Sequence, residues 1–197
     1  MDNLDRVVVG FQPIAERPQP AGGLLPRELS VVLPSEAVWE KGARGGLRVP
    51  EAAVLVAPGN WIATADLRNN LLPQRRYPWG DEWDAGRANG EETGIGSTSA
   101  VGVFAAQDNV YGAAELSGNV FEWTRSRSGE YPYKPGDGRE DAGQVSLDDF
   151  IGARGGAFYW HQTWLRCAVR LGLHPSGGYL NYGFRVVVSP ISPTADL

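Results

Sequence analysis

The chain has 197 residues, enough for one domain with a sizeable core, and no apolar run approaches the roughly 18 residues of a membrane span. Its 18 basic and 23 acidic residues give a net charge of −5, which argues against nucleic acid as the main partner. Glycine (26) and proline (14) are frequent, but seven tryptophans provide apolar area for burial, so the composition favours an ordered, loop-rich domain.

The N-terminal segment opens acidic and has no long apolar stretch, so we expect no secretory signal and a cytoplasmic location. Cys167 is the single cysteine, which excludes an intrachain disulfide and fits a reducing compartment. We expect residues 1–197 to form a single domain, with an N-terminal extension or strand over 1–30, a scaffold over 31–153 and a distinct region over 154–187.

In the first part of the chain, residues 7–9 are predicted to form a short strand before a proline-rich connector. The clearest helix is predicted over 34–44, where the proline suits the first turn and Glu36 complements the positive end of the helix. The glycine pair at 45–46 ends that helix. A further strand is predicted over 54–56.

The middle of the chain is predicted to be mostly loop over 58–108, because Gly, Asn and Pro interrupt every periodic pattern there. Its expected buried anchors are three tryptophans: Trp61, Trp79 and Trp83.

Farther along, residues 120–123 are predicted to form a short strand, and the polar, glycine-rich stretch 126–149 an exposed excursion. Two more strands are predicted at 153–158 and 183–188, the second from a β-branched run.

The region 154–187 mixes two kinds of position, which neither a helical nor a strand period orders. One kind resembles a framework: Arg154, Gly155, Gly156, Leu165, Arg166, Pro175, Gly183, Phe184 and Arg185. The other kind is scattered aromatic, small and imidazole side chains. Apolar residues without a period suit a contact surface better than a core, because rigid aromatics supply area and small polar residues supply hydrogen bonds.

Four segments in this order carry a resemblance to a known family: LPSEAVWEKGARGG (33–46), YPWGDEWDAGRAN (77–89), NVYGAAELSGNVFEWTRS (109–126) and RGGAF…RCAVR…NYGFRVV (154–187). Together they resemble the formylglycine-generating-enzyme, or sulfatase-modifying factor, domain over about residues 31 to 188. The resemblance implies an α+β fold of the C-type lectin type, in the formylglycine-generating-enzyme subclass, loop-rich with short strands and few helices.

The same resemblance bears on catalysis. The family's oxidases use a cysteine pair in the segment that corresponds to 157–164, which here contains no cysteine. Cys167 lies instead in the RCAVR element, where we expect a buried, inert thiol. The family's iron-dependent sulfoxide synthases use a histidine triad, whereas this chain has only His161 and His174. We therefore expect a non-catalytic protein, with an oxidase that uses an unusual ligand set as the alternative.

The region 154–187 is also similar to the variable region of diversity-generating retroelement proteins, in which asparagine codons of a template are replaced by others. This similarity implies a diversified surface for a ligand, most simply another protein, with the core supplied by framework residues such as Leu165 and Phe184, and by Phe158 and Cys167. Ordinary packing of the aromatics in a loop-rich core is the alternative. The implied ligand-binding positions are Tyr159, Trp160, His161, Thr163, Trp164, Val169, Leu171, Leu173, His174, Gly177, Tyr179, Leu180, Asn181 and Tyr182.

The family resemblance further implies a Ca²⁺ site in AAELSGNVFEW, because two carboxylates and two backbone carbonyls are hard oxygen donors. Its ligands would be Glu115, Gly118, Val120 and Glu122. The alternative is that Glu122 and Asn119 only hydrogen-bond the turn. A second calcium site of the family is expected to be absent, because Thr93 stands where an acidic ligand is needed; the alternative is that Glu91 or Glu92 takes its place. Arg154, Arg166 and Arg185 are expected to bridge loops rather than to bind an anion.

Overall fold

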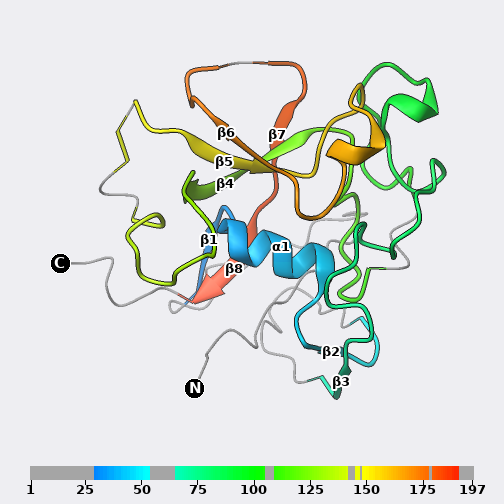
Figure 1. The fold of residues 1–197 in the computed structure, drawn as a ribbon, viewed down its shortest axis with the longest axis horizontal. Coiled ribbons are helices and arrows are strands. Elements are labelled where there is room, and N and C mark those ends of the chain that lie inside the picture. The colour runs from blue at the N-terminus through cyan, green and yellow to red at the C-terminus, as the bar shows by residue number, and fades with distance from the viewer. Residues whose placement is uncertain are drawn as a thin grey trace, which may run out of the picture.

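A computed structural model describes residues 29–53, 65–104, 109–141, 145–146, 148–177 and 179–190 of the chain. It has one α-helix, two short 3₁₀ turns and eight strands within these ranges (Figure 1). In chain order they are β1 (Leu29–Val32), α1 (Glu36–Arg44), β2 (Arg48–Pro50), β3 (Leu67–Asn69), η1 (Glu91–Thr93), β4 (Phe121–Arg127), β5 (Ile151–Arg154), η3 (Gln162–Trp164), β6 (Arg170–Leu173), β7 (Tyr182–Phe184) and β8 (Val187–Pro190). The expectation of a loop-rich α+β domain with short strands and few helices is confirmed.

Helix α1 begins two residues later than the sequence predicts. Ser35 is its N-cap, and the Ser35 hydroxyl accepts a hydrogen bond from the Val38 amide at 3.1 Å, so the proline at 34 precedes the cap. Gly45 ends the helix as predicted: its φ of 78° suits glycine, and its amide donates to the Lys41 carbonyl at 2.8 Å.

The main sheet has four strands in the order β6–β5–β4–β7, with β4 and β7 parallel and the other neighbours antiparallel. Figure 1 shows this sheet on one side of α1, with the short β2–β3 pair at the opposite end of the molecule. Strands β1 and β8 form a separate antiparallel pair. In the described part of the chain, no helix is both long and apolar enough to cross a membrane.

Several predicted strands have different bounds. Strand β5 ends at Arg154 rather than at residue 158, because Gly155 and Gly156, with φ of 96° and 80°, turn the chain out of the sheet. The run predicted over 183–188 is two strands in different sheets, β7 and β8. The predicted strands at 7–9 and 54–56, and Trp61, lie outside the described residues.

The stretch predicted as an exposed excursion, 126–149, is partly built into the domain. Strand β4 continues to Arg127, and Ser126 is fully buried, with its hydroxyl accepting the Glu36 amide at 2.8 Å. Arg139 is also buried and is held by Asp137 at 2.6 Å. The prediction was wrong here because a polar composition says nothing about long-range hydrogen bonds to α1.

The two faces of the four-stranded sheet differ in chemistry. Neighbouring residues of a strand point to opposite faces, and paired residues of adjacent strands point to the same face. Toward α1 the sheet presents charged side chains, which contact Glu36 and Trp39 of the helix: Glu122, Arg154 and Arg170. Away from α1 it presents mainly apolar side chains, with Arg127 at the end of β4 beside Ile151: Phe121, Trp123, Ile151, Ala153, Leu171, Leu173, Tyr182 and Phe184.

Charged side chains between α1 and the sheet are paired with one another. The buried Glu36 carboxylate accepts Nε of Arg170 at 2.7 Å and lies 3.8 Å from Nη1 of the buried Arg154. Arg154 also donates to Glu40 at 2.6 Å and to the Cys167 carbonyl at 2.9 Å. The expectation that framework arginines bridge loops is therefore confirmed for Arg154.

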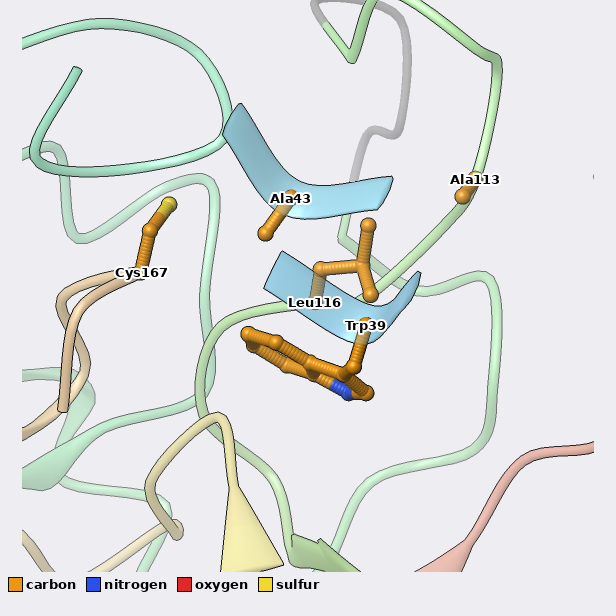
Figure 2. Close-up of a cluster of buried hydrophobic side chains, with 5 residues drawn as sticks. All are labelled: Trp39, Ala43, Ala113, Leu116 and Cys167. Carbon is orange, nitrogen blue, oxygen red and sulfur yellow. The ribbon is translucent and has the colours of Figure 1, made fainter. Parts of the chain in front are cut away.

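The apolar core beside α1 is small. Trp39 and Ala43 of the helix pack with Ala113, Leu116 and Cys167. In Figure 2 the Leu116 side chain lies beside Trp39, and Cys167 comes from a separate loop on the other side of Ala43. A second cluster contains Tyr77 and Leu165, against which Trp79 and Trp83 pack. These two tryptophans are half-buried, so the expectation that they are buried anchors is only partly met.

Candidate functional site

The scattered positions begin where the chain leaves β5. A side chain on Gly156 would come within 2.8 Å of Leu165 and 2.9 Å of the Trp164 carbonyl, so this turn packs tightly only with glycine. The turn places η3 over Leu165, which is fully buried, as predicted. Figure 1 shows η3 (the orange coil) and the β6–β7 connection at the end of the molecule remote from β2 and β3.

The aromatic side chains of this region rest on one core ring. Phe121, fully buried in β4, contacts Trp160 edge-on at a ring-centroid distance of 5.4 Å and Tyr182 at 6.0 Å. Trp160 contacts Trp164 at 4.7 Å, and Tyr182 contacts Tyr179 at 5.3 Å. Offset and edge-on ring pairs at these distances are mutually attractive. Side chains that are up to 22 residues apart in the sequence thus form one connected group.

We call this group, with two neighbours, the aromatic surface: Tyr159, Trp160, Trp164, Tyr179, Leu180 and Tyr182. Four of its members are well exposed, with 51% for Tyr159, 42% for Trp164, 65% for Tyr179 and 92% for Leu180. Trp160 and Tyr182 are half-buried because they lie directly on Phe121. The surface therefore has an outer set open to solvent and an inner pair that also belongs to the core.

The other predicted binding positions also include both exposed and half-buried side chains. His161, Thr163 and His174 are exposed, while Leu171, Leu173 and Gly177 are half-buried. The expectation of exposure is wrong for two positions, Val169 and Asn181, which are only 9% and 4% exposed. Asn181 is drawn inward because its carbonyl accepts the Phe121 amide at 2.8 Å, immediately before β7 joins the sheet.

Two predicted core residues also lie elsewhere. Phe184 is 69% exposed, and Phe158 is half-buried. Phe184 pairs with Trp123 across β7 and β4, so it points away from α1 onto the open face of the sheet. Sequence reasoning assumed that framework residues are buried. It therefore missed both Phe184 and the half-buried Trp123 as surface residues. The alternation of side chains along 121–123, combined with the β4–β7 register, was the signal that could have found them.

Both histidines bond to a hydroxyl two residues ahead. Nδ1 of His161 lies 3.0 Å from the Thr163 hydroxyl, and Nδ1 of His174 lies 2.6 Å from the Ser176 hydroxyl. His161 also lies 3.6 Å from a carboxylate oxygen of Glu92. Within the described ranges, no three His, Cys, Asp or Glu side chains gather in a way that could hold a metal ion.

The residues expected to bind Ca²⁺ are engaged with protein donors. Both oxygens of the Glu122 carboxylate face the Arg185 guanidinium, and Oε2 also accepts Nε1 of Trp39 at 2.6 Å. Glu115 accepts the Gly102 amide at 2.6 Å and Nδ2 of Asn119 at 3.2 Å.

The two other members of the expected calcium set lie between Glu115 and β4. Gly118 donates its amide to the Gly155 carbonyl at 2.7 Å, and Val120, two residues later, is half-buried. Because a guanidinium already neutralises Glu122, the set does not fit Ca²⁺ in this arrangement, and the geometry favours the turn alternative.

Chelation supplies a test of the calcium site. We expect an excess of EDTA to leave the melting temperature unchanged, because Arg185 already supplies the positive charge that stabilises Glu122. The Glu122→Gln variant, by contrast, should melt at lower temperature, since Arg185 and Trp39 lose their shared acceptor. Thermal unfolding followed by circular dichroism measures both. A drop in melting temperature on chelation that Glu122→Gln abolishes would instead support bound Ca²⁺.

Cys167 is fully buried, as predicted, and burial raises the pKa of its thiol to about 12. At pH 8 roughly one thiol in ten thousand is then ionised. We expect iodoacetamide to leave the native protein unmodified at pH 8 for hours and to alkylate Cys167 within minutes in urea. Mass spectrometry of the intact chain reads out both states, and rapid alkylation of the native protein would contradict a buried, inert thiol.

Comparison with known proteins places the chain in a family. A model of the sulfatase-modifying factor enzyme 1-like domain matches residues 21–190. The chain is 33% identical over 167 residues to an inactive C-alpha-formylglycine-generating enzyme 2 from Mus musculus, covering 84% of this chain and 45% of the relative. It is 30% identical over 172 residues to a formylglycine-generating enzyme from the same organism, covering 83% of this chain and 40% of the relative. The chain thus spans less than half the length of these curated relatives.

Solved structures share its fold. Treponema denticola variable protein 1 superposes with a TM-score of 0.56 at 18% identity, covering 82% of this chain and 48% of that one. PvdO from Pseudomonas aeruginosa superposes with a TM-score of 0.54 at 24% identity, covering 82% of this chain and 53% of that one. At these identities the likeness concerns the fold alone.

Proposed function

Because the chain belongs to the sulfatase-modifying factor enzyme 1-like family, which also contains a relative named as inactive, we propose that it is a non-catalytic binding protein. Its aromatic surface would contact a protein ligand, and retroelement-driven diversification of 154–187 would change which ligand it takes. The observation that carries this proposal is the connected set of rings in the aromatic surface, of which Tyr159, Trp164 and Tyr179 are 42% to 65% exposed. Exposed apolar patches of this kind usually mark interaction sites.

The chemistry of the surface suits a protein ligand. Tyr and Trp offer large rigid area together with a polar atom, and they are enriched where proteins recognise one another. The aromatic surface itself contains no charged side chain, and the net charge of the chain is −5, so neither a phosphate-rich partner nor a nucleic acid fits it.

The aromatic surface can be tested without the natural ligand. Random dodecapeptides displayed on phage are selected on the wild-type protein and measured against the triple variant Tyr159→Ser/Trp164→Ser/Tyr179→Ser. We expect the selected peptides to bind this variant about tenfold or more weakly, because central aromatics dominate such contacts. The variant should still unfold cooperatively, having lost about 1.5 kcal/mol or less in total.

The matched control is Leu47→Ser/Leu71→Ser/Val101→Ser, whose side chains are 80% to 82% exposed and lie outside the aromatic surface. It should bind the peptides like the wild type. Equal binding to both triple variants would contradict the proposal. The diversification step has a separate genomic test, which is a nearby repeat of the DNA for 154–187 that differs at adenines, beside a reverse-transcriptase gene.

The second candidate is an oxidase, favoured by the 30% identity to a formylglycine-generating enzyme. Against it, 157–164 contains no cysteine, and the thiol of Cys167 is fully buried with its pKa raised to about 12. We expect no formylglycine after incubation with copper, oxygen and a sulfatase-type cysteine peptide. Mass-spectrometric detection of the aldehyde would support the oxidase instead.

A further inference from the structure

The open face of the four-stranded sheet continues the aromatic surface onto framework residues. Tyr182 contacts Trp123 at a ring-centroid distance of 5.6 Å, and Trp123 pairs in register with Phe184 on β7. Phe184 is 69% exposed and Trp123 is half-buried. An unbroken apolar strip therefore runs from Tyr179 through Tyr182 and Trp123 to Phe184.

We propose that Trp123 and Phe184 form a constant part of the ligand-binding site, against which the partner protein places an apolar side chain whatever residues stand at the scattered positions. This inference rests on the proposed function. It adds two residues that lie outside the set implied by the similarity to variable regions, one of them in the scaffold more than 30 residues before that region begins.

Burial and charge support this assignment. A phenylalanine whose ring is 69% exposed contributes little to the fold, so its apolar area is available to a partner. The ring-to-ring contacts make the strip continuous with the aromatic surface, so one partner can cover both. The strip and the aromatic surface carry no charged side chain, and the occupant they fit is an uncharged, apolar segment of a folded protein.

The place of Trp123 and Phe184 in the sheet explains how these two residues can stay constant. Trp123 lies in β4, an inner strand that is paired on one side by β5 and on the other by β7. Glu122, its neighbour, is bonded to Trp39 and Arg185 on the opposite face. On the α1 face, β4 is therefore held at the position next to Trp123 by residues that do not belong to the scattered positions.

The experiment uses the full chain and the phage-selected dodecapeptides, restricted to those that lose binding to Tyr159→Ser/Trp164→Ser/Tyr179→Ser. Their dissociation constants are then measured for Phe184→Ser and Trp123→Ser. We expect both substitutions to weaken binding about tenfold for most peptides. Leu71→Ser, which removes an 82% exposed side chain after β3 at the other end of the molecule, should change nothing (Figure 1).

The outcomes separate the two proposals. Binding within twofold of wild type for Phe184→Ser and Trp123→Ser would overturn the constant strip while leaving the aromatic surface intact. If no selected peptide needs the three exposed rings, the proposed function fails and the strip fails with it. Phe184→Ser is decisive where Trp123→Ser destabilises the fold, because the exposed Phe184 ring can be removed with little loss of packing.

Discussion

The Glu36→Ala variant is expected to lose roughly 3 to 5 kcal/mol of unfolding free energy, enough to unfold a domain of ordinary stability. Glu36 is fully buried and its carboxylate is shared by Arg154 and Arg170. Removing it leaves the partly buried Arg170 guanidinium without its main counter-charge, and leaves the fully buried Arg154 guanidinium with Glu40 alone. Urea unfolding monitored by tryptophan fluorescence measures the change.

The matched control for Glu36→Ala is Glu82→Ala, which removes an exposed carboxylate and should cost about 0.5 kcal/mol or less. Glu36→Gln separates charge from shape, because it keeps one acceptor oxygen but no negative charge, and it should lie between the wild type and the alanine variant. Unfolding of Glu36→Ala at the wild-type urea concentration would mean that water reaches the arginines and that the pairing is not buried.

The second large effect concerns Phe121. Phe121→Ala should cost roughly 3 to 5 kcal/mol, because its fully buried ring supports Trp160 and Tyr182 and leaves a cavity when removed. Phe184→Ala is the paired comparison in the same sheet and should cost about 1 kcal/mol or less, since its ring is 69% exposed.

Thermal and urea unfolding of the two phenylalanine variants give a direct ranking. We expect Phe121→Ala to be far less stable than Phe184→Ala. This order of stabilities follows from burial alone and requires no ligand. The reverse order would mean that the open face of the sheet is covered in the folded protein, and neither the aromatic surface nor the constant strip would then be available to a partner.

The elements that sequence reasoning found were those with local signals. Helix α1 was predicted from an acidic first turn and a terminal glycine, both of which act within a few residues, whereas Ser35 as its N-cap was missed. Leu165 and Cys167 were placed correctly in the core. The bounds of β5 were missed because the chain leaves the sheet at two glycines, inside the strand predicted over 153–158.

The errors in the candidate site came from long-range register. Whether Phe184 points inward depends on which strand β7 joins, and its parallel pairing with β4 is fixed by residues some 60 positions away. Asn181 is buried for the same reason. The Glu122–Arg185 pair likewise joins two distant positions that no local pattern connects, and it gives an arginine partner to a carboxylate that the resemblance implies as a calcium ligand.

If 154–187 is diversified as proposed above, the contacts of Trp160 and Tyr182 with Phe121 limit the repertoire that this scaffold can display. Position 180, where the side chain is 92% exposed, can accept nearly any residue, whereas at 160 and 182 a small or charged residue would uncover a buried ring. Among naturally arising sequences of 154–187, we expect folding to remove many combinations before any ligand selects among them. The number of binding specificities is then set by the outer positions, while the inner positions decide which members of the repertoire survive as folded proteins.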